Sequence, residues 1–257
     1  MGVIEIGPWD LALASGFVLV SGGLALGFGL GLTRELAVAT VRTVVQLTAL
    51  GWVLGWIFGS GTGWLVVAIL ALMIVTAGYT ARGRVKQRGR WLALAAYGSV
   101  FLSGVTVTFA VTAIVIRVEP WFEPRYVLPI GGMVIGNTMN GVALAQERLL
   151  DGLRVRRAEV MLCLSLGATP WEAALPLIRA AFRAGMIPTL NSMATAGIVS
   201  IPGMMTGQVL AGVEPSVAAG YQIVVMLMLS AATALGSTAA LSVAYRQAFD
   251  QRQRLVL

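Results

Sequence analysis

Long apolar runs alternate with short polar gaps along the whole chain. About seven of these runs are long enough to cross the hydrocarbon core of a membrane as a helix, which takes roughly 17 to 25 residues. The runs cover residues 11–33, 36–58, 64–80, 91–116, 126–146, 186–212 and 217–245. They are continuous rather than alternating, which favours helices over the strands of a membrane barrel. The pattern therefore predicts an all-α, polytopic membrane protein with about seven transmembrane helices.

The composition agrees with a membrane-embedded chain. Hydrophobic residues make up 58% of the sequence and charged residues only 11%, whereas the surface of a soluble domain needs far more charge. The net charge of +7 does not indicate nucleic acid as a partner, because the basic residues fall in the gaps between apolar runs, where they determine topology. The chain has no histidine and one cysteine, Cys163, so an internal disulfide and the usual zinc ligand sets are excluded.

Basic residues gather in alternate gaps, namely residues 82–90, residues 147–185 and the C-terminal tail. Because basic loops stay on the cytoplasmic side of a membrane, this distribution predicts an N-out, C-in orientation. The first ten residues contain Glu5 and Asp10 and no basic residue, so we expect no cleavable signal peptide. We expect a single transmembrane domain over residues 1–257, located in the inner (cytoplasmic) membrane, with the segment 147–185 in the cytoplasm.

The segment 147–185 is the one long polar interruption, and it divides at the string "SLGATP". Gly167 suits the end of a first helix. Thr169 can cap a second helix that begins at Pro170, with Glu172 as the third helical residue of a capping box. The segment therefore predicts a helix–turn–helix elbow that stands off the membrane.

The second helix of this elbow is predicted to be amphipathic. Its apolar stripe consists of Trp171, Leu175, Ile178 and Phe182. Pro176 lies within the stripe and predicts a kink or an early end of the helix. An elbow of this kind suits docking into a groove of a soluble partner; the alternative is a helix that lies on the membrane surface.

The elbow sequence "AEVMLCLSLGATPWEAALPLIRAAF" (158–182) resembles the cytoplasmic coupling loop of ABC-transporter permeases. Glu159 and Gly167 would correspond to the glutamate and glycine of that loop, at a spacing longer than in common importers. Longer strings are similar to the FetB-type permease family, which includes bacterial proteins assigned to iron export and plant aluminium-tolerance permeases. These strings are "GGMVIGNTMNGVALAQERL" (131–149), "LGATPWEAALPLIRAAFRAGMIPTLN" (166–191) and "GIVSIPGMMTGQVLAG" (197–212).

The resemblance implies the permease subunit of an ABC transporter, which exports iron or another metal with ATP hydrolysed by a separate subunit. It implies a homodimer of this chain and a cytoplasmic ABC ATPase that binds ATP and Mg. The chain itself would bind no cofactor and would not be an enzyme. The coupling residues would be Glu159, Gly167, Ala168, Thr169, Pro170, Trp171 and Glu172. Independently, the only lysine, Lys86, follows no glycine-rich loop, so the chain lacks the P-loop that binds ATP.

Other functions remain compatible with the sequence. An ABC permease could carry a small organic solute instead of a metal. A secondary transporter would need no ATPase, but the apolar runs lack the Asp and Glu side chains that usually relay protons or sodium. A membrane anchor that only recruits a partner would not need the polar residues of the fifth and sixth runs.

Polar and sulfur-containing side chains within the runs are candidates for the translocation path. They are Arg42, Gln46, Asn137, Thr138, Asn140, Asn191, Met204, Met205 and Gln208. Each group also has an alternative role. Arg42 could instead extend its guanidinium to the lipid headgroups, and the polar residues of the fifth run could join helices. The methionines could fill space in the core. Pro188 and Pro202 bracket the sixth run and predict a broken helix there. The sequence assigns no ligands of a metal site.

Overall fold

The computed structural model describes residues 6–60, 62–84, 90–250 and 254–255. Contacts divide the chain into two compact units, and each is described by itself. The first comprises Met1–Gly61 and Leu210–Gly212, and the second comprises Thr62–Val209 and Val213–Leu257. Throughout the described ranges the regular structure is helical, apart from isolated bridges. The all-α prediction is confirmed, whereas Lys86 lies outside the described residues.

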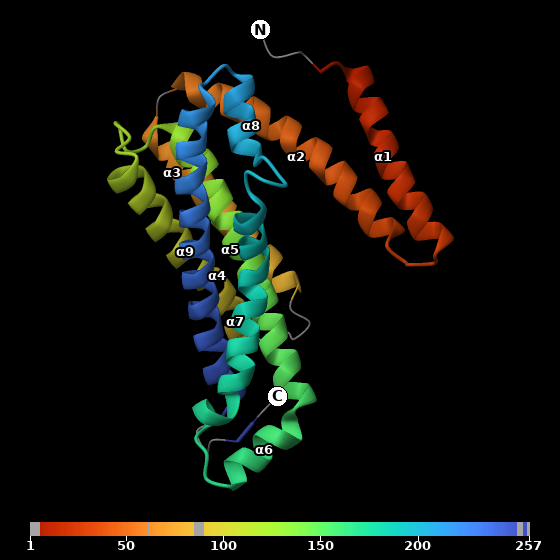
Figure 1. The fold of residues 1–257 in the computed structure, drawn as a ribbon, viewed down its shortest axis with the longest axis vertical. Coiled ribbons are helices and arrows are strands. Elements are labelled where there is room, and N and C mark those ends of the chain that lie inside the picture. Colours follow the sequence, from red (N-terminus) through yellow and green to blue (C-terminus); the bar gives the residue numbers. More distant parts are fainter. Residues whose placement is uncertain (1–5, 61, 85–89, 251–253, 256–257) are drawn as a thin grey trace. The chain divides into compact units, whose positions relative to one another are not determined.

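The first unit is a hairpin of two long helices, α1 (Pro8–Gly27) and α2 (Thr33–Ser60), which pack against each other (Figure 1). The turn between them uses Gly29 and Gly31, with φ angles of +62° and +69°, a conformation that glycine adopts without steric cost. Most side chains of both helices are exposed even though they are apolar. Such helices suit surroundings of lipid rather than water, because lipid tails are as apolar as the side chains.

The second unit is a bundle around α5 (Pro124–Val155), which packs against α3, α4, α7 and α9 (Figure 1). Buried residues lie on several faces of α5, as expected for the central helix of a bundle. The other elements are α3 (Gly63–Arg84), α4 (Arg90–Phe109), the π-helix η1 (Ala110–Val115), α6 (Arg157–Ser165), α7 (Pro170–Thr195), α8 (Gly203–Leu210) and α9 (Pro215–Ala248). Only the last residue of α8 is grouped with the first unit.

Six helices of the described ranges are long and apolar enough to cross a membrane. They are Trp9–Gly27, Thr33–Gly59, Gly63–Gly83, Trp91–Val115, Pro124–Val155 and Pro215–Ala248. These helices match six of the seven predicted runs, so the prediction of a polytopic membrane protein is confirmed. The N-out, C-in orientation stays a prediction.

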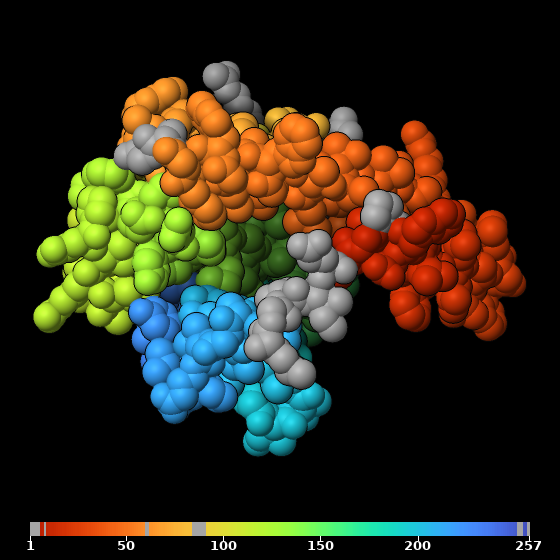
Figure 2. All heavy atoms as spheres, turned by 90° about the horizontal axis from the view of Figure 1, so that it is seen from above, coloured from red at the N-terminus to blue at the C-terminus, as the bar shows by residue number. Residues whose placement is uncertain are grey.

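The sixth apolar run, residues 186–212, does not form one continuous helix. The α7 helix ends at Thr195, and α8 begins only at Gly203. Between them Gly197 has a φ of +81° and its amide donates to the carbonyl of Ser200 at 2.9 Å. Pro202 has no amide hydrogen and disfavours helix in the residue before it. The predicted break in the sixth run is therefore confirmed. Figure 2 shows α8 at the surface.

For Pro176 the sequence predicted a kink or an early end of the helix, and the early end is wrong. The α7 helix continues for 26 residues with Pro176 and Pro188 inside it. Each proline removes only one hydrogen bond of the helix. Packing of α7 against α5 and α9 keeps the flanking turns in place.

The central helices extend well beyond the thickness of a bilayer. With 32 and 34 residues, α5 and α9 are about 50 Å long, whereas the hydrocarbon core measures about 30 Å. The C-terminal ends of α5 and α9 form a lobe together with α6 and the first turns of α7. The core of this lobe comprises Ala145, Leu149, Leu153, Val160, Ala174, Leu177, Ala181, Leu241, Ala244, Ala248 and Leu255.

Candidate functional site

The candidate site is the elbow at the tip of this lobe, which we define as residues 156–172. It contains α6, the turn 166–169 and the first residues of α7. Figure 1 shows it at the end of the bundle opposite to α8. The helix–turn–helix predicted from "SLGATP" is confirmed.

Hydrogen bonds fix the start of the second helix of the elbow. The backbone amide of Thr169 donates to Oε2 of Glu172 at 2.8 Å, and the amide of Glu172 donates to Oγ1 of Thr169 at 3.3 Å. Pro170 occupies the first helical position, and Gly167 in the turn has a φ of +89°. The predicted capping box is therefore confirmed. The bonds from the Thr169 amide and then from its hydroxyl lower the pKa of the Glu172 carboxyl below its ordinary value.

The apolar stripe of α7 packs in part against α9, although Trp171 is still 48% exposed. The rings of Trp171 and Tyr245 meet edge to face, with their centroids 5.4 Å apart. Ile178 and Phe182 pack against the core of the lobe. The stripe therefore fixes the elbow to the bundle, which the sequence alone did not reveal.

Other apolar side chains on and beside the elbow point outward instead. Val155, Leu162 and Leu166 are 85%, 61% and 80% exposed. They lie at the end of the lobe, where α6 is too short to be a membrane span. Exposed apolar patches occur at protein–protein and at membrane interaction sites. Cys163 is exposed on the same helix.

The first helix of the elbow is held firmly against the lobe. Val160 is buried in the lobe core together with Leu255 from the C-terminal tail. The guanidinium of Arg157 donates to the carbonyl of Leu255 at 3.3 Å. Glu159, a predicted coupling residue, is exposed and forms an ion pair with Arg156 at 3.8 Å. Val160 and Arg157 therefore both attach α6 to the C-terminal tail in the lobe.

The lobe joins the spanning part of the bundle where α5 and α7 touch directly. A methyl group at Gly185 of α7 would lie 2.7 Å from the carbonyl oxygen of Gly141 on α5. Ser237 of α9 lies within 3.2 Å of either added methyl group. The backbones of α5 and α7 can approach so closely because both residues lack a side chain.

The predicted path residues are divided between the two units. Arg42 and Gln46 lie exposed on α2 in the first unit, whereas the others belong to the second unit. Thr138 is fully buried, and Asn191 is exposed. Asn137, Asn140, Met204, Met205 and Gln208 are half-buried. The pockets between α3 and α4, between α7 and α9 and between α5 and α7 are lined by other residues.

Two of these residues have notable surroundings. The amide nitrogen of Asn137 donates to the carbonyl of Met133 at 2.9 Å, one turn earlier in α5. Oε1 of Gln208 is buried without a hydrogen-bond partner. Within the described ranges no group of three or more His, Cys, Asp or Glu side chains could hold a metal ion. The role of the nine residues in transport stays a prediction.

Gln146 of α5 was missed in the sequence. It is fully buried, and neither its amide nitrogen nor its amide oxygen has a partner. An unpaired buried amide costs free energy, so its presence points to a role other than packing. The signal in the sequence is its spacing of eight residues from Thr138, which places both on one face of α5. It was hidden because Gln146 sits beside the charged residues that end the apolar run.

Comparisons with known proteins place the chain in a family. The model of an uncharacterised protein family, UPF0014, matches residues 8–249. The chain is 37% identical to "UPF0014 membrane protein slr1647" of Synechocystis, over 99% of this chain and 98% of that one. It is 34% identical to "Probable iron export permease protein FetB" of Escherichia coli, over 96% and 94% of the two chains. It is 36% identical to "Protein ALUMINUM SENSITIVE 3" of Arabidopsis thaliana, over 86% and 79%.

No solved structure matches the fold. The family match covers nearly the whole chain, including all six helices that could span a membrane and the elbow. The Synechocystis relative is named as a membrane protein and the Escherichia coli relative as a permease, in agreement with the apolar helices of this structure. The chain is a multi-pass membrane protein, and it belongs to the UPF0014 family.

Proposed function

We propose that this chain is the membrane-spanning subunit of an ATP-driven permease and that a separate ATPase binds to the elbow. The observation that carries the proposal is the exposure of apolar side chains, namely Leu162 and Leu166 on the elbow and Val155 directly before it. The elbow lies beyond the helices that could span a membrane, so a soluble partner can reach it. The lobe core holds it rigidly, as force transmission requires.

The proposed coupling uses the predicted residues as structural supports. Gly167 provides the left-handed turn between the helices, and Thr169, Pro170 and Glu172 start α7. Trp171 fixes the same turn of α7 to α9 through Tyr245. Ala168 lies in the turn itself, and Glu159 lies in the first turn of α6. The partner contacts would then come from Val155, Leu162 and Leu166 rather than from the stripe, which packs in part against α9.

Movement of the elbow would reach the membrane through α5 and α7. The backbones of these helices touch at Gly141 and Gly185, so a tilt of the lobe would move their spanning parts together. Two copies of the chain, each with an ATPase bound to its elbow, would alternate between inward-open and outward-open states. The ATPase would bind ATP and Mg, and this chain would supply the path.

We propose iron or another metal as the exported substrate, because a relative is named as a probable iron export permease. The predicted path residues offer amide and hydroxyl oxygens, which suit hard cations, and thioethers, which suit soft ones. A relative named for aluminium sensitivity agrees with a substrate connected to metals. A small organic solute is the alternative, and a transport assay separates the two.

The single native cysteine provides the test of ATPase docking. Cys163 is exposed on α6, so it can be labelled with a fluorescent maleimide in the purified chain in lipid vesicles. Adding the candidate ATPase subunit should slow labelling at least about tenfold, because the bound partner covers the elbow.

A matched control uses a cysteine at the opposite end of the bundle. The variant C163S/S216C carries its only cysteine in the first turn of α9, at an exposed position. Its labelling rate should not change when the ATPase is added. Equal rates for Cys163 with and without an ATPase that copurifies with the chain would contradict docking at the elbow.

A further inference from the structure

A pocket of about 360 Å³ lies between α7 and α9, next to the core of the lobe. Among the described residues that line it, every polar side chain carries a hydrogen-bond donor and none carries a carboxylate. A set of donors that includes one guanidinium suits an anion such as a phosphate. The polar members are Trp171, Arg179, Thr238 and Ser242, and the apolar members are Ile178, Phe182 and Leu241.

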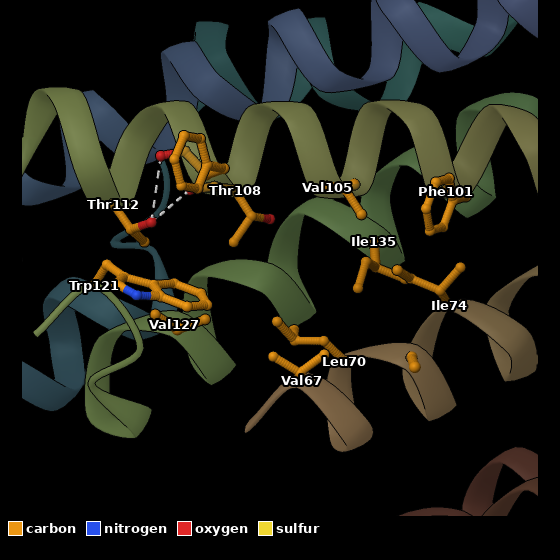
Figure 3. Close-up of a pocket in the computed structure, with 13 residues that line it drawn as sticks. Val67, Leu70, Ile74, Phe101, Val105, Thr108, Thr112, Trp121, Val127 and Ile135 are labelled. Carbon is orange, nitrogen blue, oxygen red and sulfur yellow. Dashed lines mark hydrogen bonds between the residues drawn. The ribbon is translucent and has the colours of Figure 1, made fainter. Parts of the chain in front are cut away.

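The pocket between α3, α4 and α5 has a different chemistry (Figure 3). Its described lining is apolar apart from Thr108, Thr112 and the indole of Trp121. Figure 3 shows the hydroxyl of Thr112 bonded to its own helix, where it donates to the carbonyl of Thr108 at 2.9 Å. No charged side chain belongs to this described lining. It therefore offers no means to distinguish an anionic lipid from a neutral one and can serve as a reference.

Arg179 is an exposed cation that the described part of the chain does not neutralise. It forms no ion pair with any described residue. Glu172 is the only acidic residue of α7, and its carboxylate is engaged in the capping box, whereas α9 contains no acidic residue. Arg183 and Arg246 lie one turn from Arg179 and Ser242 on the same helix faces, and both are exposed. The mouth of the pocket is therefore positively charged.

The position along α9 places the pocket at the level of the lipid headgroups. The exposed residues Glu214 and Ser216 mark the start of α9 at the opposite membrane surface. Thr238 and Ser242 follow 23 and 27 residues after Pro215, about 35 and 40 Å along the helix. The hydrocarbon core is about 30 Å thick, and the bilayer with its headgroups about 40 to 45 Å. A basic pocket between helices at this level is typical of sites for lipid headgroups.

The course of α7 gives the pocket a direction. This helix runs from the elbow at Pro170 into the bundle, so Trp171 lies at the elbow end of the pocket and Phe182 at the end nearer the membrane interior. Arg179 lies between them. The tryptophan agrees with this order, because its indole favours the headgroup region, whereas Phe182 and Leu241 offer an apolar surface to an acyl chain.

We propose that this pocket binds an anionic glycerophospholipid of the membrane. The lipid phosphate accepts hydrogen bonds from the guanidinium of Arg179, which suits phosphate oxygens. One acyl chain runs along Phe182 and Leu241 toward the hydrocarbon core, and the headgroup lies beside Trp171. The pocket is separate from the exposed apolar side chains to which we assign the ATPase, and its occupation does not depend on the proposed transport function.

The test uses the full chain in nanodiscs of phosphatidylcholine. The nanodiscs contain a trace of either phosphatidylglycerol or phosphatidylcholine, each with the same photoreactive diazirine in one acyl chain. After irradiation, mass spectrometry of peptides locates the label. We expect phosphatidylglycerol to label residues 178–182 and 238–242 about fivefold more than phosphatidylcholine, the factor for one arginine near an anionic surface. In the pocket between α3, α4 and α5 the two lipids should label equally.

Variants with matched controls test the contacts. Arg179→Gln should bring the ratio of the two labels close to one, whereas Arg179→Lys keeps the charge and should retain most of the preference. Arg148→Gln removes an exposed arginine that lines the pocket between α5 and α7, and it should leave the ratio unchanged. Ser242→Phe fills the pocket from α9 and should lower labelling by both lipids. Val243→Phe, at the next position and outside the lining, should not.

Thermal unfolding in neutral detergent separates a binding defect from a folding defect. R179Q should unfold at the temperature of the wild type, because the substitution breaks no ion pair among the described residues. The proposal is overturned if both lipids label residues 178–182 and 238–242 equally. It is also overturned if R148Q lowers the ratio as much as R179Q, since the attraction would then be diffuse. Competition by soluble glycerol 3-phosphate would overturn it too, because the ligand would then be a soluble anion.

Discussion

Gly185→Ala tests whether the contact of α5 and α7 at the base of the lobe is as close as the structure has it. The added methyl group would lie 2.7 Å from the carbonyl oxygen of Gly141 and 3.0 Å from Cβ of Ala145. The first neighbour is backbone, which cannot rotate away. The two helices must therefore move apart, and the packing of Ser237 between them must change.

The magnitude follows from two opposing effects. Alanine raises the helix propensity by about 0.8 to 1 kcal/mol over glycine, whereas overpacking in a close contact costs about 1 to 3 kcal/mol. The upper part of that range applies because the clash involves backbone, so we expect a net destabilisation of about 1 to 2 kcal/mol. Gly136→Ala on α5 is the control, because nothing lies within 4 Å of its added methyl group. It should be neutral or more stable by up to about 1 kcal/mol.

The assay is thermal unfolding of both variants in the same detergent, followed by far-ultraviolet circular dichroism. The difference between them should amount to about 1 to 3 kcal/mol. G185A should also lower ATP-dependent transport more than G136A, since the two helices no longer move together. Equal stability of G185A and G136A would refute the direct backbone contact and the transmission path built on it.

Thr169→Ala should destabilise the first turn of α7 by about 1 kcal/mol, the usual value of an N-cap, seen as faster amide exchange of residues 170–173. The pKa of the Glu172 carboxyl is lowered in the folded chain, so its stabilisation of the elbow is present above the pKa of the unfolded chain and is lost as the pH falls through the lower folded pKa. Amide exchange of residues 170–173 should therefore become faster in that pH window of an acid titration. An unchanged exchange rate would contradict the capping box. Leu166→Asp should leave stability within about 0.5 kcal/mol but weaken ATPase binding at least about tenfold, which copurification measures. Gln146→Leu should stabilise the fold by about 1 to 3 kcal/mol in thermal unfolding, and a simultaneous loss of transport would give the amide a functional role.

Local signals in the sequence predicted the elbow well. The capping box needs only Thr169, Pro170 and Glu172, which are close neighbours along the chain, so their hydrogen bonds follow from spacing. The break near Pro202 could be predicted for the same reason. Average hydropathy over 186–212 nevertheless suggested one span, because it does not register the left-handed Gly197 that separates α7 from α8.

Features that depend on contacts between distant segments could not be predicted. The stripe from Trp171 to Phe182 was correct as a pattern, but the sequence does not say that its partner is α9. Gly141 and Gly185 are 44 positions apart and reveal their contact only in the folded bundle.

The most direct test of the central claim measures metal transport in vesicles that contain this chain and its candidate ATPase. Iron efflux and ATP hydrolysis are recorded together for the wild type, for L166D at the elbow and for S216C at the opposite end. The account predicts ATP-dependent Fe(II) transport in the wild type and S216C, and loss of both transport and stimulated hydrolysis in L166D. Transport that continues in L166D, or in vesicles without any ATPase, would contradict the claim that this chain is driven through its elbow.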